Sequence, residues 1–504
     1  MTARVLMIQG TGSDVGKSLV VAGLCRLARR RGLSVAPFKP QNMSNNAAAC
    51  EGGEIGRAQA LQARAAGVEP GVDHNPVLLK PQSDRTAQVV VHGQARSTLD
   101  AANFLDGRAT LMPAVMASFE RLAARHDLVI VEGAGSAAET NLRRADIANM
   151  GFARHAGVPV CLLADIERGG VIANLVGTHA VLEAGDRDLV AGFLINRFRG
   201  DTRLFDAGLE DIIARTGWPS FGVIPWLPAA ARLPAEDAVP ENARLPREGG
   251  RALIVAPMLS RMANFDDADP LRQDPAVDFR FVPPGQPLPR NADLVILFGT
   301  KSTLGDLEFL RAQGWDHDIL AHARAGGRVL GLCGGYQMLG KRIEDPAGTD
   351  GAAGGGEGLG LLDVETRMRP DKTVHRSTGT CARSGLPVDG YEIHCGDTRG
   401  PDGARPMFDL GGRPDGARSA NGRIEGTYLH GLFASDRFRA AYLRRFSEAA
   451  TDYDYGVSVE AAIDDVADGL DAAVAVDRLL GCAREPGALS APAAVETSKF
   501  ATRH

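Results

Sequence analysis

The sequence lacks the cysteine patterns that mark disulfide-stabilised domains and zinc ribbons. It has seven cysteines in 504 residues, an odd number, and no two of them form a C-x-x-C pair. Secreted disulfide frameworks carry even sets of cysteines, and zinc ribbons carry cysteine pairs at short spacing. The cysteine usage indicates neither class and favours a reducing, cytoplasmic setting.

The sequence also lacks an excess of basic residues and any long hydrophobic run. Lys and Arg number 56 against 62 for Asp and Glu, which gives a formal net charge of -6. A generally basic surface for nucleic acid is therefore not expected. No apolar run reaches the ~18 residues of a membrane-spanning helix, and no export signal precedes the first strand-like run. We expect a chain with neither nucleic-acid nor membrane partners.

What the sequence does contain is an alternation of short apolar runs with helical or glycine-rich stretches, repeated in both halves. Such alternation is typical of a mainly parallel sheet flanked by helices, so the predicted fold class is two doubly wound α/β domains. The stretch after "GVIPWLP" is rich in Pro and charge and is interpreted as a linker. The predicted division is a first domain at residues 1–230, a linker at 231–250, a second domain at 251–485 and a loose tail at 486–504.

Glycines frame a lysine in "GTGSDVGKS", residues 10–18, between an apolar strand-like run and an amphipathic helix-like run. A strand, a glycine-rich turn and a helix N-terminus direct backbone N–H groups at one point, which suits phosphate. Five residues separate Gly10 from Gly16, one more than in the usual P-loop. The alternative is a glycine turn that only opens a helix, but the flanking strand and helix favour the phosphate site. The predicted ATP-binding residues are Gly10, Thr11, Gly12, Asp14, Val15, Gly16, Lys17 and Ser18.

An acidic residue ends the apolar run of "DLVIVEGAGS", residues 127–136. Glu132 would lie at the end of a strand, where its carboxylate would hold a magnesium ion through water, and the Ser18 hydroxyl of the lysine loop would ligate the ion. Both groups offer the oxygen ligands that Mg²⁺ prefers, and Mg²⁺ usually keeps several waters as well. Glu132 taken alone is equally well an ordinary acid at a strand end, but beside the lysine loop the metal role is favoured. Ser18 and Glu132 are therefore the predicted metal ligands, and ATP and Mg²⁺ the predicted cofactors.

A cysteine stands between glycines in "LGLCGGYQMLG", residues 330–340, where an apolar strand meets a helix-like stretch. A sharp strand-to-helix turn of this kind exposes a nucleophile and tolerates only small neighbours. Its position at a helix N-terminus favours the thiolate form of Cys333. Backbone N–H groups at Gly334, and at Gly299 and Thr300 after another strand, form the predicted oxyanion hole.

A thiolate nucleophile needs a partner base. His430 in "GTYLHG" ends another apolar strand, so it is expected to meet Cys333 at one sheet edge. His394 and Cys395 in "GYEIHCG" are a rival pair, but neither lies on a strand-to-helix turn. The other cysteines are interpreted as structural, since most cysteines of cytosolic enzymes are buried and inert. These structural cysteines are Cys25, Cys50, Cys161, Cys381 and Cys482.

Nearly the whole chain resembles the cobyric acid synthase family, the glutamine-dependent amidases of cobalamin biosynthesis. The first half resembles the dethiobiotin-synthetase-like P-loop proteins through "GTGSDVGKS" and "VEGAGS", and the second resembles the class I glutamine amidotransferases through "LGLCGGYQMLG". Further stretches of resemblance are "KPQNMSNNA" from Lys39, "ADIANMGFAR" from Ala145, "DIERGG" from Asp165, "INRFRGD" from Ile195, "NFDDADPL" from Asn264 and "GYEIH" from Gly390. The related cobyrinic acid a,c-diamide synthases typically carry a "GPDYID"-like segment where this chain has "QNMSNN".

The resemblance implies an amidoligase with two chemistries. Cys333 attacks the side-chain amide of glutamine, His430 moves the proton, and ammonia leaves a glutamyl thioester. The P-loop half uses ATP to convert a carboxylate into an acyl phosphate, which ammonia then converts into an amide. The family repeats this on the b, d, e and g carboxylates of cobyrinic acid a,c-diamide, usually in its adenosyl form, so the implied partners are a corrinoid, glutamine and ATP. The residues expected to line the corrinoid or phosphate site are Asn42, Ser44, Asn45 and Asn46.

The chain departs from the wider amidotransferase pattern after the histidine. Usual class I members carry an acidic residue two positions later, where it orients the imidazole, but Gly431 and Leu432 follow His430 here. The group that orients His430 is therefore left open. Three alternative functions are also left open: a cobyrinic acid a,c-diamide synthase, an amidase of a cell-wall lipid precursor, and a nucleotide-switched binding protein with an inactive amidotransferase fold.

Overall fold

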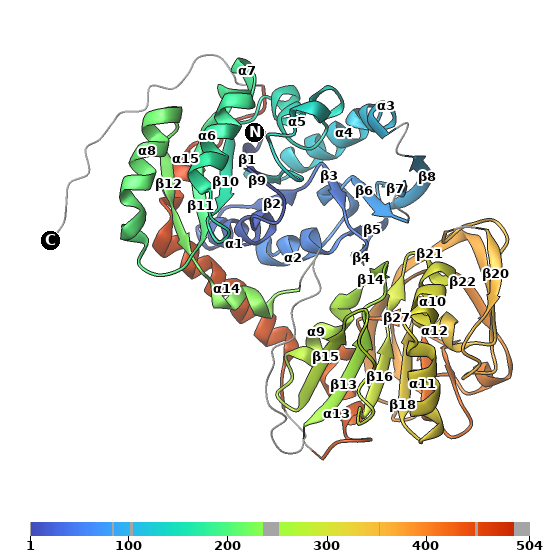
Figure 1. Ribbon diagram of the computed structural model, residues 1–504. Helices are drawn as coiled ribbons and strands as arrows, with labels where there is room; N and C mark the ends of the chain where they lie inside the picture. Colours follow the sequence, from blue (N-terminus) through green and yellow to red (C-terminus); the bar gives the residue numbers. More distant parts are fainter. Residues whose placement is uncertain are drawn as a thin grey trace.

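A computed structural model places the chain in two α/β domains that lie side by side (Figure 1). The residues that the structure describes are 2–82, 85–100, 104–234, 251–351, 353–448 and 452–487. Most of the predicted linker (235–250) and of the predicted tail (488–504) lie outside the described residues. Within the described part of the chain, no helix is both long enough and apolar enough to cross a membrane.

The first domain is built on a six-stranded sheet whose strand pairs are all parallel. In spatial order its strands are β12 (Ser220–Pro225), β11 (Val190–Phe198), β10 (Val160–Asp165), β1 (Arg4–Gly10), β9 (Leu128–Glu132) and β2 (Val35–Phe38). Because the strands are parallel, the carboxyl ends of β1, β9 and β2 meet at one edge of the sheet. The phosphate loop, Glu132 and the segment after Phe38 are thereby brought together.

Helices bury both faces of this sheet, so alternate residues of each strand enter two different cores. Val5 and Met7 of β1 belong to one core, and Leu6 and Ile8 belong to the other. The helices of this domain are α1 (Lys17–Arg30), α2 (Arg57–Ala66), α3 (Phe104–Ala109), α4 (Met112–Ala123), α5 (Met150–Ala156), α6 (Val171–Val181), α7 (Ala184–Arg187) and α8 (Asp206–Thr216).

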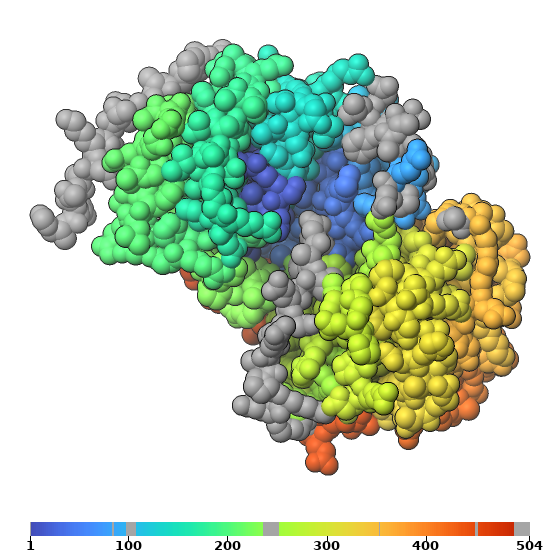
Figure 2. All heavy atoms as spheres, viewed as in Figure 1, coloured from blue at the N-terminus to red at the C-terminus, as the bar shows by residue number. Residues whose placement is uncertain are grey.

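Two small sheets extend the first domain toward the second. One has the order β3–β6–β7–β8, and the other is a hairpin of β4 and β5. Their bounds are β3 (Gln41–Met43), β4 (Ala47–Cys50), β5 (Gly53–Gly56), β6 (Val77–Pro81), β7 (Thr86–Val91) and β8 (Gln94–Asp100). Ala47, Leu78 and Val90 pack with Tyr391 and Ile393 of the second domain in one apolar cluster. In Figure 2 the blue part of the first domain meets the yellow and orange part of the second.

The second domain has its own six-stranded sheet, in which β25 pairs antiparallel at one edge and the other pairs are parallel. Its strands are β15 (Val277–Val282), β13 (Ala252–Pro257), β16 (Leu294–Leu297), β18 (Arg328–Leu332), β26 (Ile424–Thr427) and β25 (Ala417–Arg418). Its helices are α9 (Asp269–Arg272), α10 (Thr303–Ala312), α11 (Trp315–Arg324), α12 (Gly334–Leu339) and α13 (Asp436–Leu443). The predicted fold class, two doubly wound α/β domains, is confirmed.

A second sheet in this domain, largely antiparallel, was not predicted from the sequence. It is dominated by the long strands β21 (Glu365–Cys381) and β22 (Pro387–Arg399). The other strands of this sheet are β19 (Arg342–Asp345), β20 (Gly354–Glu357), β23 (Phe408–Leu410), β24 (Arg413–Asp415) and β27 (Leu429–His430). A separate pair joins β14 (Met262–Ala263) to β17 (Gly299–Thr300). Because β27 pairs with β22, His430 lies beside Tyr391.

The prediction that residues 251–485 form one domain is wrong for the last part of that range. Helices α14 (Tyr455–Ala473) and α15 (Val476–Gly481) return to the first domain and complete the core around α1 (Figure 1). The apolar face of α14 packs on α1, where a Cβ on Gly23 would collide with Leu470. Ion pairs flank this contact, among them Arg30–Asp464 at 2.8 Å. The predicted boundary placed these helices in the second domain, whereas their apolar residues belong to the core of the first.

Candidate active sites

The phosphate loop lies between β1 and α1 and requires glycine at its two ends. Gly16 has φ +93°, and a Cβ there would collide with the Asn196 side chain. A Cβ on Gly10 would lie 2.6 Å from the Gly12 carbonyl oxygen and 2.8 Å from Lys17 Nζ. The turn is thus tight enough to direct its backbone toward one point at the N-terminus of α1.

Lys17 folds back over this loop. Its Nζ donates hydrogen bonds to the carbonyl oxygens of Gly12, at 3.0 Å, and Gly135, at 2.8 Å, and the residue is 7% exposed. The remaining predicted loop residues are held by the flanking strands. Thr11 N donates to Leu163 O, Val15 O accepts from Asn196, and Asp14 lies 3.7 Å from Arg197.

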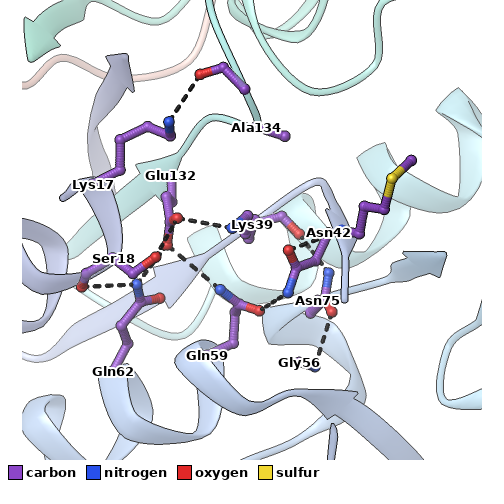
Figure 3. Close-up of polar contacts among 12 residues, drawn as sticks. Lys17, Ser18, Lys39, Asn42, Gly56, Gln59, Gln62, Asn75, Glu132 and Ala134 are labelled. Carbon is purple, nitrogen blue, oxygen red and sulfur yellow. Dashed lines mark hydrogen bonds and ion pairs between the residues drawn. The ribbon is translucent and has the colours of Figure 1, made fainter. Parts of the chain in front are cut away.

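Glu132 is the centre of a buried polar cluster beside the loop (Figure 3). Its Oε1 lies 2.7 Å from Ser18 Oγ and 2.8 Å from Lys39 Nζ, and its Oε2 accepts from Gln62 at 2.6 Å. Gln59 lies at 3.5 Å from the same Oε2. Burial alone would raise the pKa of Glu132, but the charge of Lys39 and the hydrogen bonds from Lys39, Gln62 and Ser18 outweigh burial and lower it. The carboxylate is therefore ionised.

Ser18 and Glu132 fit a magnesium ion by their chemistry. Both side chains line the space in front of the phosphate loop and carry oxygen atoms. Oxygen is the ligand type that Mg²⁺ prefers. Among the described residues, no group of three or more His, Cys, Asp or Glu side chains could hold a metal ion. A magnesium ion bound here would therefore complete its shell with phosphate oxygens and water, as it usually does beside nucleotides.

This cluster lies in a broad cleft of about 2050 Å³ that is open to solvent. Lys17, Ser18, Lys39 and Glu132 lie in it together with Asn42. Two large apolar side chains on the cleft wall are solvent-exposed, Met43 at 46% and Trp226 at 41%. The cleft therefore has a polar end at the phosphate loop and exposed apolar side chains on its wall.

Cys333 occupies a strained turn between β18 and α12, with φ 52° and ψ -109°. The neighbouring glycines are required by crowding: a Cβ on Gly335 would collide with the Leu297 backbone, and one on Gly334 would lie 2.6 Å from Thr300 Cγ2. The Cys333 thiol lies 3.5 Å from the carbonyl oxygen of Ile393. This is the geometry expected for an exposed nucleophile on a strand-to-helix turn.

The group that hydrogen-bonds and orients the imidazole of His430 is Asp267. Its Oδ2 lies 2.7 Å from His430 Nδ1, and its Oδ1 accepts from Gly431 N at 2.6 Å. Cys333, His430 and Asp267 are therefore arranged as a candidate nucleophile, proton carrier and orienting carboxylate. Tyr391 stacks on the imidazole, with ring centroids 5.2 Å apart at an interplanar angle of 14°.

The charge state of His430 follows from these neighbours. Burial alone would lower the pKa of His430, but the Asp267 carboxylate, which also accepts a hydrogen bond from the ring, and Cys333 raise it to about 10. At neutral pH the imidazole of His430 is therefore protonated and positively charged, and it lines the same cavity as Cys333.

The predicted oxyanion residues lie against this triad. A Cβ on Gly299 would come 3.5 Å from His430 Cε1 and 3.6 Å from Cys333 Cβ, so Gly299 lies close to both residues. Gly334 begins α12 and faces Thr300. The rival pair is not a dyad, because His394 stacks on Tyr428 at 3.8 Å and hydrogen-bonds the Gly396 carbonyl instead of a thiol.

The glutaminase cavity, which holds Cys333 and His430, is small, about 490 Å³, and residues of both domains line it. Asn45 and Lys80 come from the first domain. Beside it, Lys80 Nζ lies 2.7 Å from Glu54 Oε2, and Lys372 of β21 pairs with Glu54 Oε1, so a buried ion cluster joins the domains.

The four polar residues predicted to line one substrate site are divided by the structure. Asn42 lies in the broad cleft, where its side chain donates to Gln59 at 3.0 Å. Asn45 lies in the glutaminase cavity. Asn46 accepts from the Asn264 backbone N–H at 2.6 Å across the domain interface, and Ser44 Oγ accepts from Asn46 N at 3.0 Å. The segment thus spans from one site to the other, which corrects the expectation of a single site.

Helix α2 makes a second connection between the sites. Gln59 and Gln62 on this helix contact Glu132, and Arg57 at its first turn pairs with Asp266 at 2.8 Å. Arg57 also hydrogen-bonds the hydroxyl of Tyr391, whose ring stacks on His430. Helix α2 thus contacts residues of both sites.

Sequence reasoning missed Lys39 and Asp267 as functional residues, although both stand in stretches that carried the family resemblance. Lys39 follows β2 at the same sheet edge as the phosphate loop, which was a usable signal. Asp267 is 163 positions from His430 and lies in a short 3-10 turn, so no spacing rule connects the two.

Two family models together match most of the chain. The nucleotide-binding domain shared by the CobQ, CobB, MinD and ParA proteins matches residues 6–240, and the CobB/CobQ-like glutamine amidotransferase domain matches residues 253–438. Cobyric acid synthase of Hyphomonas neptunium is 66% identical, covering 98% of this chain and all of that protein. Cobyric acid synthase of Paracoccus denitrificans is 62% identical, covering 95% of this chain and 99% of that protein.

The fold and the two sites define a glutamine-dependent ligase in which a P-loop domain and an amidotransferase domain share one chain. The chain belongs to the cobyric acid synthase family.

Proposed function

We propose that the chain has cobyric acid synthase activity, amidating the b, d, e and g carboxylates of cobyrinic acid a,c-diamide with ATP and glutamine. The observation that carries this proposal is the pairing of the Glu132 cluster at a phosphate loop with the Cys333–His430–Asp267 triad in one chain. The identity to cobyric acid synthases over nearly the full length supports the choice of acceptor. A nucleotide-switched binding protein would not need an intact triad.

In the glutaminase half, the Cys333 thiolate attacks the side-chain carbonyl carbon of glutamine. The oxyanion that forms is stabilised by the N–H groups near Gly299 and Gly334. The C–N bond then breaks as the His430 imidazolium gives its proton to the leaving nitrogen, so ammonia departs and a thioester is left. Water, deprotonated by His430, hydrolyses the thioester to glutamate and restores the thiolate.

In the P-loop half, an oxygen of the substrate carboxylate attacks the γ-phosphorus of ATP and ADP leaves. Lys17 and the loop N–H groups stabilise the charge that develops on the phosphoryl oxygens. Ammonia attacks the acyl phosphate, and loss of inorganic phosphate and a proton gives the amide. Lys39 holds Glu132 in place, and the broad cleft leaves room for the corrinoid at the transferred phosphoryl group.

Mg²⁺ would be held by Ser18 and Glu132, where it would neutralise phosphate charge when bound. The partners that we assign are the small molecules ATP, glutamine and a corrinoid. All seven cysteines are free thiols, which fits a reducing cytoplasm as the site of the reaction.

Mass spectrometry of the corrinoid tests the acceptor. Cobyrinic acid a,c-diamide, in adenosylated and unadenosylated form, is incubated with the protein, ATP, Mg²⁺ and glutamine. Stepwise appearance of species with one to four new amides is expected. ATP- and glutamine-dependent turnover with another carboxylic acid but none with this corrinoid would contradict the proposal.

A further inference from the structure

The glutaminase cavity holds more charge than the triad uses. Besides Cys333 and His430, its lining includes three lysines, Lys80, Lys301 and Lys372, and one aspartate, Asp350. All four charged side chains are largely buried, with 1% to 13% of each side chain exposed. Buried charges are costly unless they are paired, so each needs a partner within the cavity.

Two of the lysines have such a partner. Lys80 and Lys372 both pair with Glu54, whose carboxylate is fully buried between them. The charge of Glu54 is shared by both ammonium groups, and this cluster binds β5 and β6 of the first domain to β21 of the second. We infer that this ion cluster stabilises the contact between the two domains.

Lys301 differs from the other two lysines. It is 9% exposed, and its shortest ion pair among the described residues is to Asp350 Oδ1 at 4.0 Å, the outer limit for such a contact. Burial alone would lower the pKa of Lys301, but Asp350 and other nearby groups, Cys333 among them, raise it. The side chain is therefore a buried ammonium group that lines the cavity of the nucleophile and has no ion pair shorter than 4.0 Å among the described residues.

Asp350 is positioned as the complementary group. Thr303 at the start of α10 fixes one oxygen, Asp350 Oδ2, through its backbone N–H at 3.0 Å and its hydroxyl at 2.6 Å. The other oxygen, Oδ1, faces Lys301. One acceptor oxygen and one ammonium group are thus held 4.0 Å apart beside the triad.

We propose that Lys301 and Asp350 form the site that recognises the α-amino acid headgroup of glutamine, with Lys301 binding the α-carboxylate and Asp350 Oδ1 binding the α-ammonium group. The headgroup is a zwitterion, so it satisfies both buried charges at once, and the side-chain amide is left to reach Cys333. This assignment rests on the proposed glutaminase function. It adds to that function the residues that select a free amino acid as the ammonia source.

A site that recognises the headgroup should discriminate between glutamine and analogues that lack one headgroup charge. A site built to bind a substrate group discriminates strongly against analogues that lack the group, because its own polar atoms are then buried without a partner. Glutaramate is glutamine without the α-ammonium group, and 4-aminobutanamide is glutamine without the α-carboxylate. Both keep the amide that Cys333 attacks.

The test measures glutaminase kcat and KM of the full chain, with ATP and corrinoid present, for glutamine and for each analogue. In Asp350→Asn we expect the glutamine KM to rise about 10- to 100-fold, with kcat changed far less, as for loss of a charged hydrogen bond. The KM for glutaramate should hardly change, so the preference for glutamine over glutaramate collapses. In Lys301→Gln the preference over 4-aminobutanamide should collapse instead.

Matched controls separate recognition from folding. Lys341→Gln and Asp363→Asn alter an exposed ion pair of the same domain and should leave all KM values unchanged. Amidation driven by ammonium chloride should persist in Lys301→Gln and Asp350→Asn, which establishes that both variants are folded and synthetically competent.

The outcomes are distinguishable. If glutamine is hydrolysed by the unmodified protein but the analogue preferences are the same in both variants, the headgroup assignment is wrong and the glutaminase function stands. If the unmodified protein hydrolyses no glutamine while ammonium supports amidation, the glutaminase function is wrong and the headgroup assignment falls with it.

Discussion

The two active sites differ in how their parts are distributed along the chain. Most of the phosphate site comes from one contiguous loop, residues 10–18, with Glu132 added from the neighbouring strand β9. The glutaminase triad draws Cys333, His430 and Asp267 from three distant segments. A contiguous site can be found from spacing, whereas a distributed one becomes visible only when the strands are paired.

The sites also differ in how they are enclosed. The ATP cleft is broad and open, about 2050 Å³, whereas the cavity around Cys333 is about 490 Å³ and is closed in part by Asn45 and Lys80 of the other domain. A large acceptor and a nucleotide need access, while ammonia must be released away from bulk water. The glutaminase site is therefore expected to depend on domain docking far more than the ATP site does.

The largest effect is expected from Asp267→Asn. The change keeps the shape but removes the carboxylate that orients His430, and we expect glutaminase kcat to fall about 10⁴-fold, as in a triad with the wrong tautomer. The charge that raises the pKa of His430 is also lost, so burial would lower that pKa. Because the imidazolium persists only below its pKa, the alkaline limb of the pH–rate profile should move to lower pH.

Measurement of glutaminase kcat/KM against pH tests this prediction, with Asp363→Asn as the control on an exposed aspartate. An unchanged alkaline limb in Asp267→Asn would show that Asp267 does not set the charge of His430.

The next effect is expected at the other site. Lys17→Ala should reduce amide formation about 10³-fold or more with glutamine and with ammonium alike, because the developing phosphoryl charge loses its cation. Assays with each nitrogen source should show the same loss, and the control Lys341→Ala should show none. Full activity of Lys17→Ala with ammonium would contradict a role for Lys17 in phosphoryl transfer.

Domain docking is tested by Glu54→Gln. This change leaves Lys80 and Lys372 buried without their shared counter-ion, and we expect the free energy of unfolding to fall by about 3–5 kcal/mol. Denaturant unfolding measures this, with Glu69→Gln, an exposed glutamate, as the control. The rate of glutamine hydrolysis should fall more than the rate of ammonium-dependent amidation. An equal fall in both rates would contradict the expectation that the glutaminase site depends more on domain docking than the ATP site does.

A smaller effect is expected from Arg57→Ala. Removal of this first-domain side chain leaves Asp266 without its ion pair and leaves the Tyr391 hydroxyl with its hydrogen bond from Asn264 alone. The Tyr391 ring stacks on His430, so the imidazole loses part of its support. We expect glutaminase kcat to fall about 10-fold, on the scale of one hydrogen bond to a charged group. Arg64→Ala on the same helix, where the side chain pairs with Glu460, is the control and should retain activity. Equal losses in both variants would indicate a general disturbance of α2.

Much of the fold could be predicted because apolar runs and glycine turns determine the backbone conformation of their own segments. The loop at residues 10–18 and the turn at Cys333 both follow from backbone sterics that only glycine relieves, so the sequence carries them directly. The return of α14 to the first domain could not be predicted, since the apolar face of a helix does not indicate which sheet or helix it packs against. Asp267 and the division of Asn42 from Asn45 were hidden for a related reason, because each depends on contacts between distant segments.

The most direct test of a two-site amidoligase is the product mass of the corrinoid made by Cys333→Ala with ATP and Mg²⁺, supplied either with glutamine or with ammonium chloride. We expect no new amide from glutamine and stepwise amidation from ammonium at a rate close to that of the unmodified protein. Amide formation from glutamine, or loss of both reactions in a folded variant, would contradict the division of the chemistry between Cys333 and the phosphate loop.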